Sequence, residues 1–142
     1  MNLQCRNLIE QLEKIGATEP ESVCWTEDEN GEETDGEDYC YDCALNLAGE
    51  ENMVREGGPM DSEGSRVCNG CGKILAVDLT LGGVESELEH FETYPPEDDI
   101  RHRRNLIDIL EGIRSEEKES KLYLQAVGLV DEYLRNLNTK RK

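Results

Sequence analysis

Two cysteine pairs decide the fold, Tyr39-Cys40-Tyr41-Asp42-Cys43 and Val67-Cys68-Asn69-Gly70-Cys71-Gly72. The two pairs are separated by the 24 residues between Cys43 and Cys68. Two residues between paired cysteines let both sulfurs of a tight turn point at one ion. Four thiolates at about 2.3 Å form the closed tetrahedron that structural zinc accepts. The Gly-rich connection absorbs its extra length at small entropic cost. The sequence therefore predicts one structural Zn²⁺ held by Cys40, Cys43, Cys68 and Cys71.

The two cysteine pairs resemble parts of known zinc modules. The second pair, with glycine after its last cysteine, resembles the knuckle of zinc-ribbon and treble-clef proteins. The first pair leads into a short helical pattern over 44–48 and resembles the helix-borne half of a treble clef. More loosely, the run from Cys68 to Glu92 is similar to small uncharacterised cysteine-pair proteins of bacteriophages and other mobile elements. These resemblances imply a fold element and a metal, and they imply no activity.

Other uses of the cysteines fit the sequence less well. Rubredoxin-like iron sites have glycine after both pairs, whereas Ala44 follows the first pair here. A redox pair needs the end of a βαβ strand, and a deaminase zinc needs H-x-E ahead of P-C-x-x-C, whereas His90-Phe91-Glu92 follows both pairs. Cys5 is expected to be a small buried hydrophobe. A replacement of one zinc ligand by Cys24 or His90 stays open.

The charge is strongly asymmetric along the chain. The net charge is −18, and residues 1–96 carry 23 acidic and 5 basic side chains, whereas residues 97–142 carry 10 of each. Between Glu19 and Asp38 lie ten acids and no base, interrupted by the turn dipeptides Asn30-Gly31 and Asp35-Gly36. This segment is expected to be a loop or a hairpin. Apolar residues make up 36% of the chain, whereas about 45–50% is usual. A metal is therefore expected to add stability to a thin core.

Hydrophobic periodicity predicts an α+β fold. Residues 2–15, 99–113 and 118–137 have the spacing of amphipathic helices, and residues 73–81 alternate as a strand does. Pro95-Pro96 marks a boundary. We therefore expect an acidic zinc-binding module with an N-terminal helix over 1–96 and a helical hairpin with a basic tail over 97–142. A homodimer through residues 97–137 is a further expectation.

The acidic run suggests a binding function. Its carboxylates repel one another and repel nucleic-acid phosphates, which argues against nucleic-acid binding by residues 1–96. We expect it to bind a partner protein with a basic surface or groove by imitating nucleic acid, as phage-encoded inhibitors do. The residues expected at this contact are Glu27, Asp28, Glu32, Glu33 and Asp35. Solvation of a loop is the simpler interpretation, and adaptation to high salt is a third, although high-salt adaptation would spread over the whole chain.

The alternative function is a zinc-ribbon protein that binds nucleic acid through its C-terminal bases, namely Arg101, Arg103, Arg104, Lys140, Arg141 and Lys142. No phosphate-binding loop, nucleophile elbow or EF-hand template is found, so no enzyme is expected. No run of about 20 apolar residues and no secretory signal pattern is found. The expected location is therefore the cytoplasm, which is the host cytoplasm if a phage encodes the protein.

Overall fold

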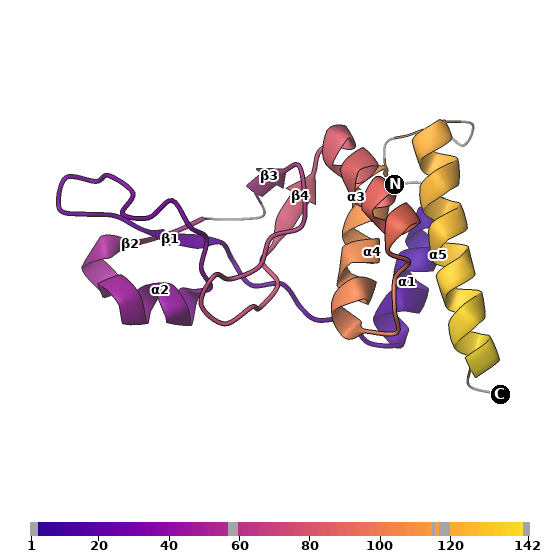
Figure 1. The fold of residues 1–142 in the computed structure, drawn as a ribbon, viewed down its shortest axis with the longest axis horizontal. Coiled ribbons are helices and arrows are strands. Elements are labelled where there is room, and N and C mark those ends of the chain that lie inside the picture. Colours follow the sequence, from indigo (N-terminus) through magenta and orange to yellow (C-terminus); the bar gives the residue numbers. More distant parts are fainter. Residues whose placement is uncertain (1–2, 57–59, 115, 117–119, 141–142) are drawn as a thin grey trace. The chain divides into compact units, whose positions relative to one another are not determined.

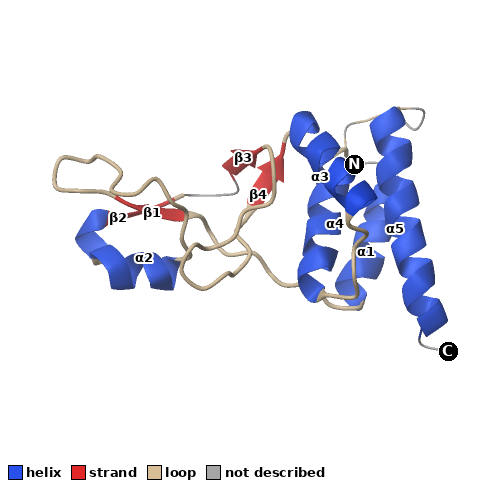
Figure 2. Cartoon of the chain, in the orientation of Figure 1, coloured by secondary structure: helices blue, strands red, loops and turns tan. Residues whose placement is uncertain are grey.

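A computed structural model describes residues 3–56, 60–114, 116 and 120–140 (Figures 1 and 2). Helices and short strands both occur, which confirms the α+β class. No helix among the described residues has the length and apolarity needed to cross a bilayer. The elements in chain order are α1 (Leu3–Lys14), β1 (Cys24–Thr26), α2 (Tyr41–Ala48), a 3₁₀ turn η1 (Glu50–Asn52), β2 (Met53–Arg55), β3 (Met60–Ser62), β4 (Val77–Leu79), α3 (Leu81–Thr93), α4 (Ile100–Gly112) and α5 (Lys121–Lys140).

The chain forms two compact units. The helical unit comprises Met1–Thr18, Ser62–Gly64 and Leu79–Lys142, and the cysteine unit comprises Glu19–Asp61 and Ser65–Asp78. This division differs from the expected boundary after residue 96, because α1 packs on α4 and α5. The apolar face of α1 is buried there rather than on the small cysteine unit.

The helical unit is built around α4. Five apolar side chains of α4 and its C-cap are completely buried, namely Leu106, Ile107, Ile109, Leu110 and Ile113. Helices α1, α3 and α5 all pack against α4, and α1 contributes the buried face that includes Cys5. The expected burial of Cys5 as a small hydrophobe is thus confirmed. The predicted helices over 2–15, 99–113 and 118–137 correspond to α1, α4 and α5, although residues 2, 118 and 119 of these predictions lie outside the described residues.

The segment after the second cysteine pair differs from its prediction. Only Val77–Leu79 of the predicted 73–81 strand is strand, because Ile74 and Leu75 are both buried and so break the alternation. Thr80 then caps α3, with its hydroxyl accepting from the Gly83 amide at 3.0 Å. Helix α3 was not predicted.

Gly83, near the start of α3, and Gly112, the last residue of α4, allow close packing within the helical unit. A Cβ at Gly83 would lie 2.8 Å from the Ser62 carbonyl oxygen, and one at Gly112 would lie 2.5 Å from Val84 Cγ2. The glycines that lower the helix propensity of the sequence are therefore required by the tertiary contacts.

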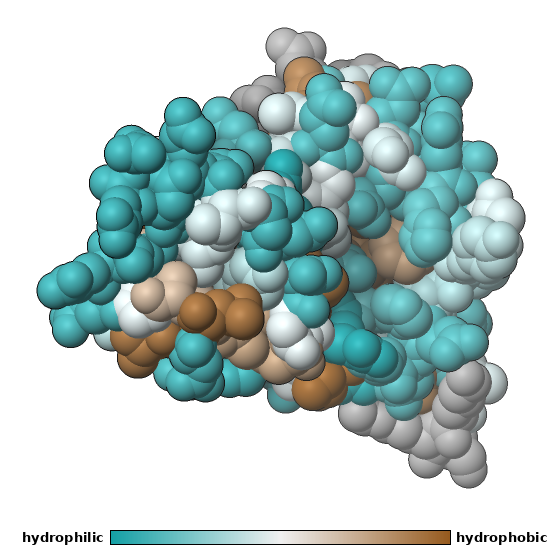
Figure 3. Space-filling view, turned by 60° about the vertical axis from the view of Figure 1, so that its left-hand side comes forward, coloured by the Kyte–Doolittle hydropathy of each residue, from teal (hydrophilic) through white to brown (hydrophobic). Residues whose placement is uncertain are grey.

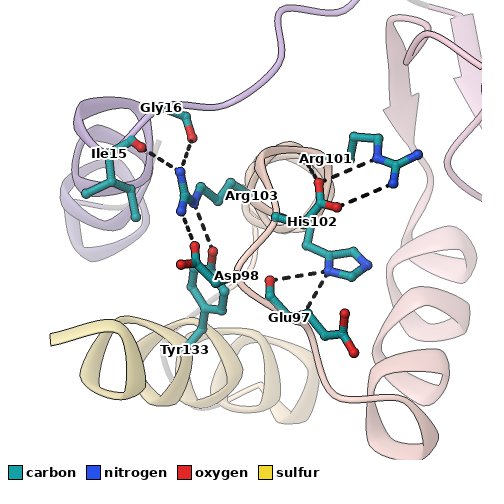
Figure 4. Close-up of polar contacts among 9 residues, drawn as sticks. Ile15, Gly16, Glu97, Asp98, Arg101, His102, Arg103 and Tyr133 are labelled. Carbon is teal, nitrogen blue, oxygen red and sulfur yellow. Dashed lines mark hydrogen bonds and ion pairs between the residues drawn. The ribbon is translucent and has the colours of Figure 1, made fainter. Parts of the chain in front are cut away.

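Arg103 joins three elements of the helical unit (Figure 4). Its Nη1 donates to the carbonyl oxygens of Ile15 at 2.6 Å and Gly16 at 3.1 Å, which lie just after the last residue of α1. Its Nε donates to the Tyr133 hydroxyl of α5 at 2.9 Å, and its Nη2 pairs with Asp98. A single buried guanidinium from α4 therefore closes the end of α1 and fixes α5.

The first prediction concerns this network. Arg103→Met should lower the free energy of unfolding of the helical unit by about 3–5 kcal/mol, because it leaves several buried polar groups without their charged partner. Urea unfolding followed by helical circular dichroism measures the change. Arg101→Gln is the matched control, because the Arg101 side chain is 65% exposed and should change stability by no more than about 1 kcal/mol. Equal effects of the two substitutions would show that the network is not stabilising.

Asp108 is a buried carboxylate on α4. Burial raises the pKa of Asp108 to about 6, and the charges of Glu111 and Glu87 add to the rise, although Arg104 opposes it. Arg104 donates to Asp108 Oδ1 from Nε at 3.1 Å and from Nη2 at 3.0 Å. The single cation does not offset the loss of water around the carboxylate.

The second prediction is a pH dependence. Because the folded pKa lies above the unfolded value, the folded state binds the proton more tightly, and this group's contribution to stability falls as pH rises from about 4 to about 6. Asp108→Asn removes that loss, so its stability relative to the parent should rise by about 3 kcal/mol between pH 4 and pH 7. Denaturant unfolding at several pH values measures it. Asp99→Asn should shift the other way and only below about pH 4, because hydrogen bonds from Arg101 lower the pKa of Asp99 below its ordinary value. A pH-independent difference for Asp108→Asn would contradict the argument.

Candidate metal centre

The core of the cysteine unit surrounds the two cysteine pairs. Strand β1 pairs antiparallel with β2 in the register Trp25↔Val54, and Cys24 and Thr26 on either side of Trp25 are buried. The buried cluster is small and includes three cysteines; its members are Val23, Cys24, Tyr39, Cys40, Ala44, Cys68 and Leu75.

The first cysteine pair lies at the start of α2. Cys40 is the N-cap residue, with an extended backbone, and Cys43 lies in the first helical turn. Free amides and the positive end of the helix dipole are located there, and both stabilise thiolates. The predicted position of the first cysteine pair at the start of a helix is therefore confirmed.

The second pair forms a tight knuckle. The Cys68 amide donates to the Lys73 carbonyl oxygen at 2.8 Å, and the Gly72 amide donates to the Cys68 carbonyl oxygen at 2.9 Å. The Gly70 amide donates to Cys68 Sγ at 3.3 Å. Gly70 is required by packing, because a Cβ there would lie 2.9 Å from Cys43 Sγ. Gly72 has a φ of +80°, which side chains rarely adopt.

The four sulfurs meet in one cluster. The Sγ atoms of Cys40, Cys43, Cys68 and Cys71 all lie within 4.8 Å of one another. The Cys40 and Cys71 sulfurs are 3.7 Å apart, which matches the separation of about 3.8 Å between ligands on a tetrahedron with 2.3 Å metal–sulfur bonds. A disulfide would need about 2.05 Å. The arrangement can therefore hold a metal ion, and these are the ligand residues expected from the sequence.

The thiols of this cluster differ in acidity. Burial alone would raise the pKa of Cys68, but the backbone amides of Cys40, Cys71 and Gly70 lower it to about 6. Hydrogen bonds to Cys40 and Cys68 raise the pKa of Cys43 to about 12. The amides around Cys68 therefore favour its thiolate form, and a metal ion would displace protons from the other thiols.

Within the part of the chain that the structure describes, neither Cys24 nor His90 belongs to the group of four sulfurs. Cys24 is buried beside it, but its Sγ points to the Ser22 carbonyl oxygen at 3.8 Å, and burial raises its pKa. His90 lies on α3, with its ring centroid 5.3 Å from that of Phe91 and 5.4 Å from that of Tyr94. His90 is therefore an exposed residue of α3 whose ring contacts two nearby aromatic side chains.

The acidic run forms an irregular hairpin that leads directly into Cys40. We call residues 24–39 the acidic hairpin. Antiparallel bridges join Cys24 to Tyr39 and Glu27 to Glu33. The turn closes through a hydrogen bond from the Gly31 amide to the Asp28 carbonyl oxygen at 3.0 Å, and Gly31 has a φ of +81°. The loop-or-hairpin prediction is thus resolved as a hairpin.

Of the five expected contact residues, three accept hydrogen bonds within the acidic hairpin and two extend into solvent. Asp28 Oδ1 accepts from the amides of Asn30 at 2.9 Å and Glu32 at 3.0 Å, so it holds the turn. Asp35 accepts from the Glu37 amide at 3.1 Å and the Tyr39 hydroxyl at 2.5 Å.

Among the glutamates, Glu27 accepts from the Trp25 indole at 3.0 Å. Glu32 and Glu33 are exposed and make no side-chain hydrogen bond or ion pair within the described residues.

The basic residues proposed for nucleic-acid binding are partly engaged in the fold. Arg103 is buried in its network, and Arg104 pairs with Asp108 and Glu111, with its side chain 17% exposed. Arg101 is exposed beside Asp99. The side chain of Lys140, and Arg141 and Lys142, lie outside the described residues. Two of the three arginines of α4 are therefore structural, a role that the sequence pattern did not reveal.

Comparisons with protein-family models, with curated proteins and with solved structures found no match to this chain. The likeness to zinc-ribbon and treble-clef knuckles therefore rests on the local geometry of the two cysteine pairs.

The third prediction separates the two units. Chelation should unfold the cysteine unit, because metal binding contributes on the order of 10 kcal/mol to folding of such modules. The helical unit should persist, because its core contains none of the four ligands. Trp25 is the single tryptophan and reports on the cysteine unit. Helical circular dichroism reports mainly on α1, α3, α4 and α5. Trp25 emission should shift to the red while most helical signal remains.

Matched cysteine variants control this experiment. Cys40→Ser with Cys71→Ser should abolish metal retention, whereas Cys24→Ala removes a buried cysteine of the same core and should keep the metal. Parallel loss of Trp25 burial and helical signal would show that the two units fold as one.

Proposed function

We propose that this protein is a non-catalytic zinc-binding interaction protein. The observation that carries the proposal is the convergence of four cysteine sulfurs at the spacing of a tetrahedral tetrathiolate site. Four protein ligands leave no open position for a substrate or water, which is the arrangement of structural rather than catalytic zinc. Zinc is favoured over iron because one sulfur pair is borne on a helix start, unlike the paired glycine-containing loops of rubredoxin-like sites.

Metal analysis tests the identity of the ion. The purified protein should contain about one zinc per chain, and replacement by Co²⁺ should produce the intense visible absorption of tetrahedral cobalt thiolates. Iron in the protein as isolated would overturn the zinc assignment.

The charge of the cysteine unit supports an interaction role. It carries 16 acidic and 3 basic side chains, whereas the helical unit carries 17 and 12. Zinc bound by four thiolates adds two further negative charges. Residues 28–37 of the acidic hairpin are all exposed, and the surface in Figure 3 is hydrophilic over most of its area. Such a field steers association with a basic surface.

We further propose that the acidic hairpin imitates nucleic acid and docks on a basic groove of a host protein or defence complex, as an inhibitor of phage type would. Hydrogen bonds accepted by Asp28 and Asp35 give the loop a defined shape, and the bonds between the Cys24 and Tyr39 backbones at 2.8 Å connect it to the core around the four cysteines. Carboxylates on a rigid scaffold would keep fixed spacings, as phosphates do. Nucleic-acid binding by the chain itself is the weaker alternative, because Arg103 and Arg104 are engaged within the helical unit.

The fourth prediction uses glutamates that the fold does not need. Glu29→Lys, Glu32→Lys and Glu33→Lys together should weaken binding of the partner by at least tenfold at low salt. The loss should shrink in high salt, because exposed charges are screened beyond about 8 Å at physiological ionic strength. The partner is obtained by affinity purification from the host, and its affinity is measured by calorimetry against the parent and the variant.

Two controls make the test specific. Glu10→Lys, Glu13→Lys and Asp131→Lys change the net charge equally but lie on α1 and α5. Duplex DNA should compete with the parent protein for the partner. Equal affinities of the parent and the hairpin variant, with zinc content unchanged, would reduce the acidity to solvation and overturn the mimicry proposal.

A further inference from the structure

The helical unit has a continuous groove between α3 and α5. Its central hollow has a volume of about 350 Å³ and is lined by α3, by Pro95-Pro96 and by α5. A second hollow of about 240 Å³ shares Leu88, Glu92 and Gln125 with it, and a third of about 230 Å³ shares Pro96, Tyr133 and Asn136. Together they run beside α5 from Lys121 to Thr139, which corresponds to about 27 Å of helix.

The floor of the groove is apolar. Leu88 and Phe91 of α3 and Tyr133 of α5 line it, and Leu129 and Leu122 of α5 are only half-buried beside them. The prolines give the groove a rigid apolar end. Leu88, Phe91 and Tyr133 are buried at the bottom of the groove, whereas Leu122 and Leu129 are incompletely covered, and an additional helix in the groove would cover them.

The rim of the groove is acidic. Glu85, Glu89 and Glu92 lie along α3 at i, i+4 and i+7, so they follow one edge. Glu132 lies on the opposite edge, and Lys121 is the single base that lines the three hollows. All four glutamates are exposed and make no ion pair within the described residues. An apolar floor with unpaired acids along its edges complements an amphipathic helix whose polar face is basic.

A second copy of this chain fits the groove less well. The predicted homodimer would use this same face of α5, but a symmetric contact would place the α3 glutamates near those of the partner copy. Like charges brought together in an interface are destabilising. Nucleic acid is disfavoured by the same charges.

We propose that the α3–α5 groove binds an amphipathic helix of a partner protein, with apolar residues spaced i, i+4 and i+7 on Leu88, Phe91 and Leu129 and with Lys or Arg facing Glu85, Glu89 and Glu92. This binding is separate from the proposed role of the acidic hairpin, which lies in the other unit. The protein thereby has two acidic recognition surfaces of different kinds. One presents charge alone, and the other combines charge with an apolar floor.

The fifth prediction tests the groove with the full-length, metal-containing protein. The probe is a fluorescein-labelled 18-residue peptide of leucine, alanine and lysine with leucines on one helical face. A scrambled peptide of the same composition has the same charge but no apolar face. Fluorescence anisotropy should show at least tenfold tighter binding of the amphipathic peptide, and the peptide should become helical on binding.

Variants assign this binding to the groove. Leu129→Gln should weaken binding of the amphipathic peptide by at least fivefold. Glu85→Gln, Glu89→Gln and Glu92→Gln together should weaken its binding by at least tenfold at low salt. Glu29→Gln, Glu32→Gln and Glu33→Gln change the same charge in the acidic hairpin and should leave the preference for the amphipathic peptide intact. This control also separates failure of the groove proposal from failure of the mimicry proposal.

Three outcomes would overturn the proposal. The first is equal binding of the two peptides, which would show attraction by charge alone. The second is an equal loss from the hairpin control. The third is a stable dimer in analytical ultracentrifugation that Leu129→Gln dissociates, because a second copy would then occupy the groove.

Discussion

The convergence of four cysteine sulfurs is the constraint on which the cysteine unit depends. Its buried cluster has seven members, and Cys24, Cys40 and Cys68 are three of them. A unit with so few buried apolar side chains cannot offset the conformational entropy of its loops by hydrophobic burial alone. Two of the four clustered cysteines, Cys40 and Cys68, belong to this core, so the candidate metal site and the core share residues. The helix start at Cys40 and the knuckle at Cys68 have their conformations because both must deliver sulfur to one point.

The helical unit is stabilised in a different way. Its helices bury extended apolar faces around α4, and its principal polar device is the Arg103 guanidinium, which satisfies carbonyl oxygens at the end of α1. Arginine suits this position because its fixed fork of donors reaches several acceptors at once. The helical unit carries 17 acidic and 12 basic side chains, so repulsion between its like charges is weaker than in the cysteine unit, which carries 16 and 3.

Sequence reasoning found the parts of the structure that depend on local patterns. The C-x₂-C spacing identified the four clustered cysteines, and helical periodicity located α1, α4 and α5. Helix α3 was missed because Gly82-Gly83 suppressed its local propensity, although Val84, Leu88 and Phe91 have helical spacing. The unit boundary was missed because it depends on which partner buries α1, and no local pattern records that choice.

The roles of Arg103 and Arg104 were missed for a related reason. A basic run on a helix looks the same in sequence whether its side chains face solvent or acceptors contributed by distant segments. Arg103 reaches Gly16 and Tyr133, which are far away along the chain. Only the packing of α4 against its neighbours distinguishes a structural arginine from one that is available to a partner.

The acids of the two proposed surfaces show how structure and recognition are divided between side chains of the same charge. In the acidic hairpin, Asp28 and Asp35 bond to nearby backbone amides, which the short aspartate side chain reaches easily. The longer Glu32 and Glu33 side chains extend into solvent without such bonds. On α3, Glu85 and Glu89 likewise project from a regular helix whose backbone needs nothing from them. The aspartates thus set the shape of the hairpin, and Glu32 and Glu33 supply exposed charge, so changes to these two glutamates should alter the charge of the surface without altering the fold.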